Sequence, residues 1–274
     1  MKLQFTNGYR PRFDQISRIL QYLHAQDGRA EVPRREIVSS LAIPDRQAEN
    51  LTSMMIGFGL VVPKQTLLTP LGKLVVRCDP YFERLETLWI IHYLVSSNPE
   101  WVVWYRIINT VLPSEEDYAI DEVSRRFFSD LAVHFSERTL SEKLPTEVGA
   151  VFTAYTRTQF LRLGILRDSG RGHFTKSEPV DVPEEAFLFC LVHFRDTCSP
   201  GSSALTTKDV GSAERSPGKV LHLADAQVRT LLGNLHDAGW IRLERFADLD
   251  QVRLPDALRQ ESVLESIYRK NGTA

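Results

Sequence analysis

One pattern recurs three times along this chain, and it limits the folds that are available. A stretch with helical apolar spacing ends at a glycine, and two short β-type runs joined by a polar turn follow it. The three glycines are Gly59, Gly164 and Gly239. Glycine adopts positive φ without strain, so it can end a helix and let the chain reverse. The recurrence therefore predicts three helix–hairpin units, in which each hairpin covers a core that the helices leave open.

The first of these units follows the element order of a winged helix-turn-helix domain. Apolar residues at helical spacing predict a helix over 13–25 and a second helix after Pro33. A third helix starts near Pro44 and buries one apolar stripe. A hairpin over 60–68 completes the unit. The stripe consists of Ala48, Leu51, Met55 and Phe58.

The rest of the chain is expected to contain a central helical layer and two further units. Two helices over 82–112 meet at the sequence SSNPE, and an acidic loop then leads to a helix at about 121–137. Residues 197–219 are rich in Ser, Gly, Thr and Pro, which is typical of a linker. The expected fold is mainly α, with tandem winged helix-turn-helix-like units and small β-hairpin wings around a central helical layer. Its parts would span 1–78, 79–137, 138–196 and 197–274.

Charge is distributed unevenly along the chain. Residues 1–78 carry 11 Lys and Arg against 6 Asp and Glu, whereas residues 79–147 carry 6 against 13. A basic N-terminal part favours an anionic partner, and nucleic acid is the commonest one. No apolar run is long enough to cross a membrane, so no membrane partner is expected. The three cysteines lack paired or metal-ligand spacing, which favours a reducing cytoplasm.

The third helix of the first unit is the strongest candidate for DNA contact. Arg, Gln and Asn side chains make paired hydrogen bonds to base edges in a major groove. The face opposite the apolar stripe carries Arg46, Gln47, Asn50 and Ser53. Further cations of this unit are placed to touch phosphates. They are Arg34, Arg35, Lys64 and Lys73. The alternative interpretation is an ordinary solvated helix face.

The second unit has the more basic hairpin. Its candidates for DNA contact are Arg157, Arg167, Arg171, His173 and Lys176. The turn SGRG is flexible enough to follow a groove, although a mobile charged hairpin without a ligand has the same sequence pattern. The third unit carries Asp248 and Asp250 in its hairpin, so it is expected to contact protein or to pack within the fold.

Catalytic signatures are absent from the sequence. There is no phosphate-binding glycine loop, no nucleophile elbow and no zinc-ligand spacing, so no catalytic residue, metal site or cofactor is expected. His92 lies in an apolar helix and is expected to be a hydrogen-bonded core residue. His193 and Asp196 share a possible helix but have no further ligands beside them.

Aromatic side chains on the two central helices allow two interpretations. They are Trp89, Trp101, Trp104 and Tyr105. Such a group can stack on nucleic-acid bases. Their spacing along apolar helices favours a shared core instead.

Several stretches resemble a prokaryotic family named domain of unknown function 4007. They are LTPLGK (68–73), LWIIHYLVSSNPE followed by WVVWY (88–105), and YTRTQFLRLGIL (155–166), and the likeness covers about 30–195. The family usually opens with a motif containing Phe, Gly, His and Glu, whereas this chain has LQFTNGYRPRF. The resemblance implies a bacterial or archaeal protein encoded near DNA phosphorothioate-modification and other anti-phage genes. It implies no particular activity and no catalytic residues.

The sequence thus predicts a non-enzymatic protein that binds double-stranded DNA in a prokaryotic defence or DNA-modification system. It also fits an assembly adapter that binds other proteins of the same locus, with the acidic middle segment docking a basic partner. A transcriptional regulator has the same sequence features, and an enzyme with an unrecognised site fits them less well.

Overall fold

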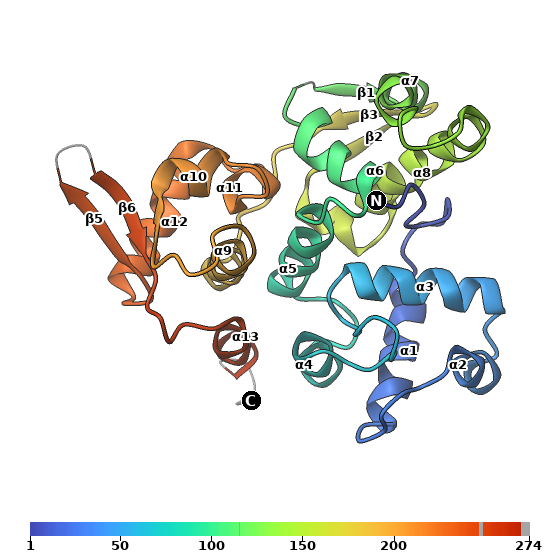
Figure 1. The fold of residues 1–274 in the computed structure, drawn as a ribbon, viewed down its shortest axis with the longest axis horizontal. Coiled ribbons are helices and arrows are strands. Elements are labelled where there is room, and N and C mark those ends of the chain that lie inside the picture. The colour runs from blue at the N-terminus through green and yellow to red at the C-terminus, as the bar shows by residue number, and fades with distance from the viewer. Residues whose placement is uncertain (115, 247–248, 270–274) are drawn as a thin grey trace.

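Helices account for most of the computed structural model, which describes residues 1–114, 116–246 and 249–269 (Figure 1). Two small antiparallel sheets of three strands each accompany them. The buried apolar side chains form one connected core. None of the described helices is long and apolar enough to cross a membrane. The mainly helical class agrees with the prediction.

The first three helices form where their apolar spacing predicts them. They are α1 (Phe13–Ala25), α2 (Arg34–Leu41) and α3 (Asp45–Gly57). Ala42 ends α2 in the left-handed region with φ of 52°, which makes the turn into α3 tight. Helix α3 buries the predicted residues Ala48, Leu51 and Met55.

The first predicted hairpin is present only in part. The chain forms a single bridge between Val61 and Leu68 instead of a two-stranded wing. A further helix, α4 (Pro70–Cys78), follows directly. It forms because the Thr69 hydroxyl accepts a hydrogen bond of 3.0 Å from Gly72 N, which is the N-cap of a helix. The apolar run that suggested a returning strand therefore leads into a helix.

The three glycines predicted to end helices do so. Their φ values are 71° at Gly59, 68° at Gly164 and 76° at Gly239. Gly59 follows α3, and Gly164 ends the 3-10 turn η2 (Gln159–Leu163) that follows α8 (Glu137–Arg157). Gly239 comes after α12 (Asp225–Asp237). The prediction of positive φ at these positions is confirmed.

The central segment contains the expected helices. They are α5 (Leu85–Ser96), α6 (Val102–Arg106) with the π-helical turn η1 (Ile107–Val111), and α7 (Ile120–Leu131). Trp89, Trp101 and Trp104 are at most 2% exposed. The three tryptophans therefore belong to the core, as the second interpretation expected, whereas Tyr105 is half-buried and donates a hydrogen bond to Glu214.

The two sheets are built in the same way. In the first, β1 (Asp117–Ala119) precedes α7 and α8, and the hairpin β2 (Leu166–Gly170)–β3 (His173–Lys176) pairs back onto β1 in the order β1-β3-β2. In the second, β4 (Ala204–Thr206) precedes α10 (Thr207–Ser212), α11 (Pro217–Val220) and α12, and the hairpin β5 (Arg242–Phe246)–β6 (Leu249–Arg253) gives the order β4-β6-β5. Both predicted hairpins after Gly164 and Gly239 are present. Asp248, expected in the second of them, lies outside the described residues.

Two segments predicted as irregular are folded. The acidic loop before α7 contributes β1, which pairs with β3. The expected linker 197–219 contains β4, α10 and the start of α11. Its Thr and Ser residues cap helices: Thr206 accepts from Asp209 N at 2.9 Å, and Ser216 accepts from Lys219 N at 3.3 Å. These residues therefore define helix starts and not a flexible connection.

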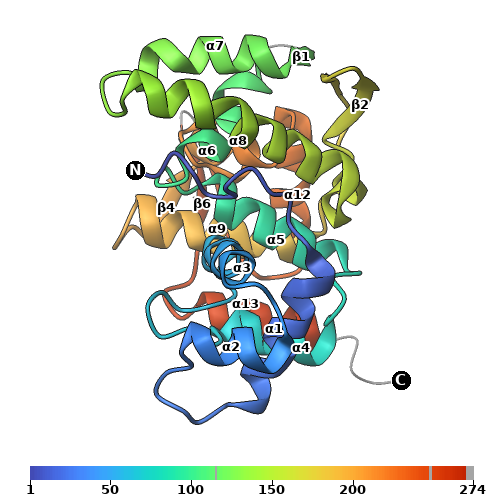
Figure 2. The same cartoon turned by 90° about the vertical axis from the view of Figure 1, so that its right-hand side faces the viewer.

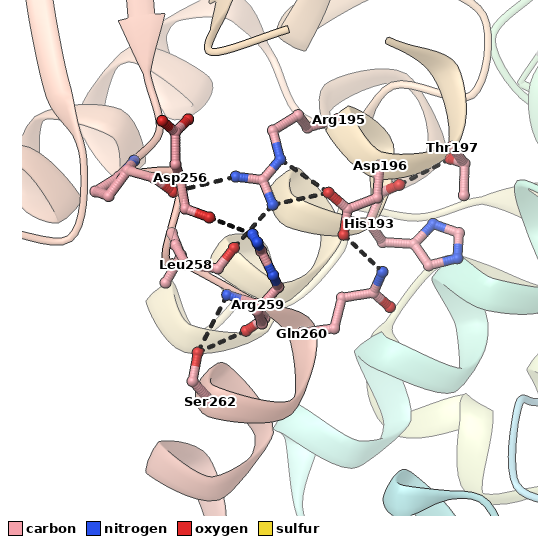
Figure 3. Close-up of polar contacts among 10 residues, drawn as sticks. His193, Arg195, Asp196, Thr197, Asp256, Leu258, Arg259, Gln260 and Ser262 are labelled. Carbon is pink, nitrogen blue, oxygen red and sulfur yellow. Dashed lines mark hydrogen bonds and ion pairs between the residues drawn. The ribbon is translucent and has the colours of Figure 1, made fainter. Parts of the chain in front are cut away.

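The C-terminal helix α13 (Gln260–Arg269) packs against both α9 (Glu184–Cys198) and α4. Figure 3 shows how the segment before α13 is held on α9. Arg195 is 6% exposed, pairs with Asp196 (2.7 Å) and donates to the carbonyl of Leu258 (2.8 Å). Gln260 donates to the other oxygen of Asp196 at 3.0 Å. These contacts hold the segment before α13 against α9.

Candidate nucleic-acid interface

The N-terminal segment, residues 1–12, runs between α8 and α3 (Figure 2). The carboxylate of Glu147 on α8 holds this segment by its backbone. Its Oε1 accepts hydrogen bonds from Phe5 N (2.7 Å) and Thr6 N (2.6 Å), and its Oε2 accepts one from Gly8 N (3.2 Å). Glu147 is 1% exposed, and burial raises its pKa while these three donors oppose the rise.

The N-terminal segment covers part of the predicted DNA-reading face of α3. Arg46 is exposed and Gln47 and Ser53 are half-buried, but Asn50 is only 3% exposed. The Asn7 side-chain amide donates to Asn50 Oδ1. The expectation that all four residues share a solvated face is therefore wrong for Asn50, because residues distant in the sequence lie over it.

A cleft of about 500 Å³ lies between this segment and α3. Its lining residues are Tyr9, Arg10, Arg12, Pro44, Arg46, Gln47, Asn50, Leu51 and Met54. Arg12 forms an ion pair with Asp14 at 2.9 Å. Arg10 and Arg46 form no ion pair with any described residue and are exposed. The cleft thus combines unpaired positive charge at its rim with amides and apolar side chains.

The other predicted cations of the first unit divide into two groups. Arg34 pairs with Asp45 (3.1 Å) and Glu49 (3.5 Å), and Lys73 pairs with Asp27 (2.8 Å). These ion pairs lie at the surface, where such pairs stabilise a fold little. Arg35 and Lys64 are exposed and form no ion pair with a described residue, although the Arg35 charge helps to lower the pKa of the neighbouring Glu36.

The predicted cations of the second unit lie around the hairpin β2–β3. Arg157 is held by Asp168 at 2.7 Å, and Arg167 Nε donates to the Ser177 hydroxyl at 3.1 Å. The exposed side chains of Arg171 and His173 lie at and beside the turn, and Lys176 at the end of β3 is half-buried. The hairpin therefore presents cations to solvent, while Arg157 on α8 is already paired.

His92 is a core residue, as expected. One ring nitrogen lies 2.6 Å from the Tyr155 hydroxyl and the other 3.0 Å from the Val220 carbonyl oxygen. Complete burial lowers its pKa from 6.5 to about 4.

The His193 ring packs against Tyr93, with 5.6 Å between ring centroids, while Asp196 is bound by Arg195 and Gln260 (Figure 3). Asp196 therefore makes its hydrogen bonds elsewhere, although its charge opposes the fall in the His193 pKa that burial causes. Over the described part of the chain, no cluster of three or more His, Cys, Asp or Glu residues could hold a metal ion.

Comparisons with known proteins identify a family and a fold. A family model described as "Protein of unknown function (DUF4007)" matches residues 55–268. The match starts later than the quoted resemblance and extends beyond it into α13. No curated protein matches the sequence.

Two solved structures have a similar fold, "SspB crystal structure" with a TM-score of 0.76 and "Magnesium ion-bound SspB crystal structure" with 0.74. In both comparisons the sequence identity is 12%, and the alignment covers 97% of this chain and 87% of the other. At this identity the likeness concerns the fold alone.

Proposed function

The chain belongs to the family of the domain of unknown function 4007, and from that premise we propose that it is a non-enzymatic DNA-binding protein of a prokaryotic defence or DNA-modification system. One observation carries the proposal. Arg10, Arg35 and Arg46 are exposed around α2 and α3, and none forms an ion pair with a described residue. Guanidinium groups bind phosphate oxygens through two parallel hydrogen bonds, and unpaired ones do so without first losing a carboxylate.

The order of the elements supports the proposal. Before each β-hairpin of the second and third units comes a short strand and then helices, and the hairpin pairs back onto that strand. We propose that these units, together with α1–α3, are winged helix-turn-helix-like. In such domains one helix of the pair lies against DNA, and α3, α8 and α12 occupy the corresponding place before Gly59, Gly164 and Gly239.

The three units would then bind different partners. Considering ion pairs between described residues only, the first unit has cations without such a pair around α3, and the second has them on its hairpin. In the third, Arg229 on α12 is paired with Asp250 at 3.0 Å. We therefore assign DNA contact to the first and second units and protein contact to the third.

One of the two structures of similar fold is described as magnesium-bound. Magnesium is held by oxygen ligands, usually one or two carboxylates completed by waters or substrate phosphates. The described residues contain no group of three or more candidate ligands. No step of the proposed function is therefore assigned to the cation.

Salt-dependent DNA binding tests the proposal. Wild-type protein should bind a duplex, and log Kobs should fall linearly with log salt. The triple variant Arg10→Gln, Arg35→Gln and Arg46→Gln should reduce the slope by up to about 2.7, since each lost phosphate contact removes about 0.9. Lys208→Gln on α10 is the matched control, because Lys208 is an exposed cation of the third unit. An unchanged slope in the triple variant would contradict the assignment.

The assembly adapter remains the second candidate because of the acidic middle segment. Residues 79–147 carry 13 acidic against 6 basic residues, and Asp121 and Glu122 lie at the start of α7. Such a surface fits a basic protein partner and repels DNA. Absence of DNA binding even at low salt would favour the adapter. A strong sequence preference among duplexes would instead favour a transcriptional regulator.

A further inference from the structure

Three of the four residues expected to form a projecting DNA-reading face on α3 line the cleft instead: Arg46, Gln47 and Asn50. Asn50 is buried, Gln47 is half-buried, and the N-terminal segment stands over them. A major groove accepts a convex helix whose side chains project from it. A recess instead accepts a part of the nucleic acid that projects from the duplex.

The walls of the cleft match the chemistry of a nucleobase. Leu51 and Met54 supply buried apolar surface, and the Tyr9 ring, 54% exposed, lies at the rim. Bases taken out of the helical stack pack between aromatic and apolar side chains in this way. The volume of about 500 Å³ is in the range of small-ligand sites.

The side chain of Asn50 is buried, and its amide nitrogen is available to a ligand. Its Oδ1 accepts a hydrogen bond from Asn7, whereas its Nδ2 donates to no described atom. Because Nδ2 is not among the buried polar atoms that lack a partner, solvent reaches it from the cleft, and a ligand that accepts a hydrogen bond there can take the place of water. The edges of nucleobases carry such acceptors.

We propose that this cleft binds one unpaired nucleotide of DNA. Its base lies between Tyr9 and the apolar floor, its edge meets Asn50 and Gln47, and its phosphate meets Arg10 and Arg46. The nucleotide comes either from a base everted out of a duplex or from a single-stranded end, and both present the same chemistry. This inference rests on the proposed DNA binding and names the form of DNA that this site recognises.

Three duplexes of identical sequence test the inference: a blunt duplex, one with a single bulged nucleotide, and one with a short single-stranded overhang. The wild-type protein should bind at least one of the last two about ten-fold more tightly than the blunt duplex, as expected for stacking of one base. Preference for the bulge identifies eversion within a duplex, and preference for the overhang identifies capture of an end.

Two variants should abolish the preference while the protein remains folded. Tyr9→Ala removes an exposed ring, and Gln47→Trp fills the cleft from a half-buried position. Tyr81→Ala is the matched control, because Tyr81 is 64% exposed outside the cleft. Thermal unfolding of each variant confirms that it is folded.

The possible failures separate the two proposals. Equal affinity for all three duplexes would overturn the unpaired-nucleotide site and leave DNA binding intact. A preference that persists in both variants would also overturn the site. Binding to none of the three duplexes would overturn both proposals.

Discussion

Replacing Glu147 with alanine removes the carboxylate that holds the N-terminal segment on α8. Phe5 N and Thr6 N are buried and lose their acceptor, while Gly8 N keeps a second contact with the Thr6 hydroxyl at 3.2 Å. Leaving the two amides unpaired costs about 2–6 kcal/mol. The segment can detach instead, which exposes the buried side chains of Leu3 and Phe5 at about 1.5–3 kcal/mol each.

The outcome with the smaller free-energy cost determines how much stability is lost. Removing a buried carboxylate also removes the cost of burying it, which makes the loss smaller. We therefore expect Glu147→Ala to lower the free energy of unfolding by about 2–4 kcal/mol. Urea unfolding measures this loss, and hydrogen exchange at the Phe5 and Thr6 amides shows whether the segment has detached. Glu147→Gln keeps one acceptor oxygen and should lose less. A loss below about 1 kcal/mol with unchanged exchange would refute the role of Glu147 as an anchor.

The pH dependence gives an independent check on Glu147. Burial raises the pKa of Glu147 in the folded protein above its ordinary value. The folded state therefore holds this proton more tightly than the unfolded state, and protonation favours folding. Stability of the wild type relative to Glu147→Gln should rise as pH falls from neutral towards the unfolded pKa of about 4.3. A relative stability that falls over this interval would show that the donors outweigh burial.

Two further predictions concern the core. Gly72→Ala should destabilise by about 2–4 kcal/mol, because its Cβ would lie 2.1 Å from the Leu60 carbonyl oxygen. The control is Gly233→Ala on α12, where the added Cβ meets nothing within 4 Å. It should raise the free energy of unfolding, measured in urea, by about 0.5–1 kcal/mol. Equal effects of the two changes would contradict this reasoning. The pKa of His92 falls from 6.5 to about 4 on folding. The stabilisation that neutral His92 gives the folded state is therefore present above pH 6.5 and is lost as pH falls towards 4. The difference in stability between wild type and His92→Gln should shrink by up to about 3 kcal/mol over that range, and parallel pH curves would refute the assignment.

Local chemistry explains which parts of the fold the sequence can predict. The hairpins after Gly164 and Gly239 are predictable because the helix-ending glycine and the polar turn are neighbours in the chain. The same reasoning fails after Gly59, where the N-cap Thr69 starts α4. A Thr-Pro pair before an apolar run is itself a helix-start signal, so the sequence does contain the evidence for α4. The Ser and Thr residues of 197–219 are a similar case, since composition alone does not separate caps from a linker.

The parts of the fold that the sequence does not predict depend on pairing between distant segments. Strands β1 and β4 have three residues each and are defined by partners far along the chain, so no periodicity reveals them. The burial of Asn50 depends on Asn7, 43 positions away, and on Glu147 further still. The cations of α2 and α3 are visible in the sequence, but the cleft that Arg10 and Arg46 share is not.

The packing of α13 on α4 has a consequence for synthesis of the chain. Helix α13 also contacts the start of α5: Arg84 donates to the Ile267 carbonyl at 3.0 Å and Thr87 contacts the Tyr268 hydroxyl at 2.7 Å, across 183 and 181 positions. At about 5–20 residues per second, the ribosome needs roughly 10–40 s to make the intervening chain. During that time the surface of α4 that α13 will cover is open to solvent. A nascent chain released early would keep that apolar surface exposed, and chaperones recognise such surfaces.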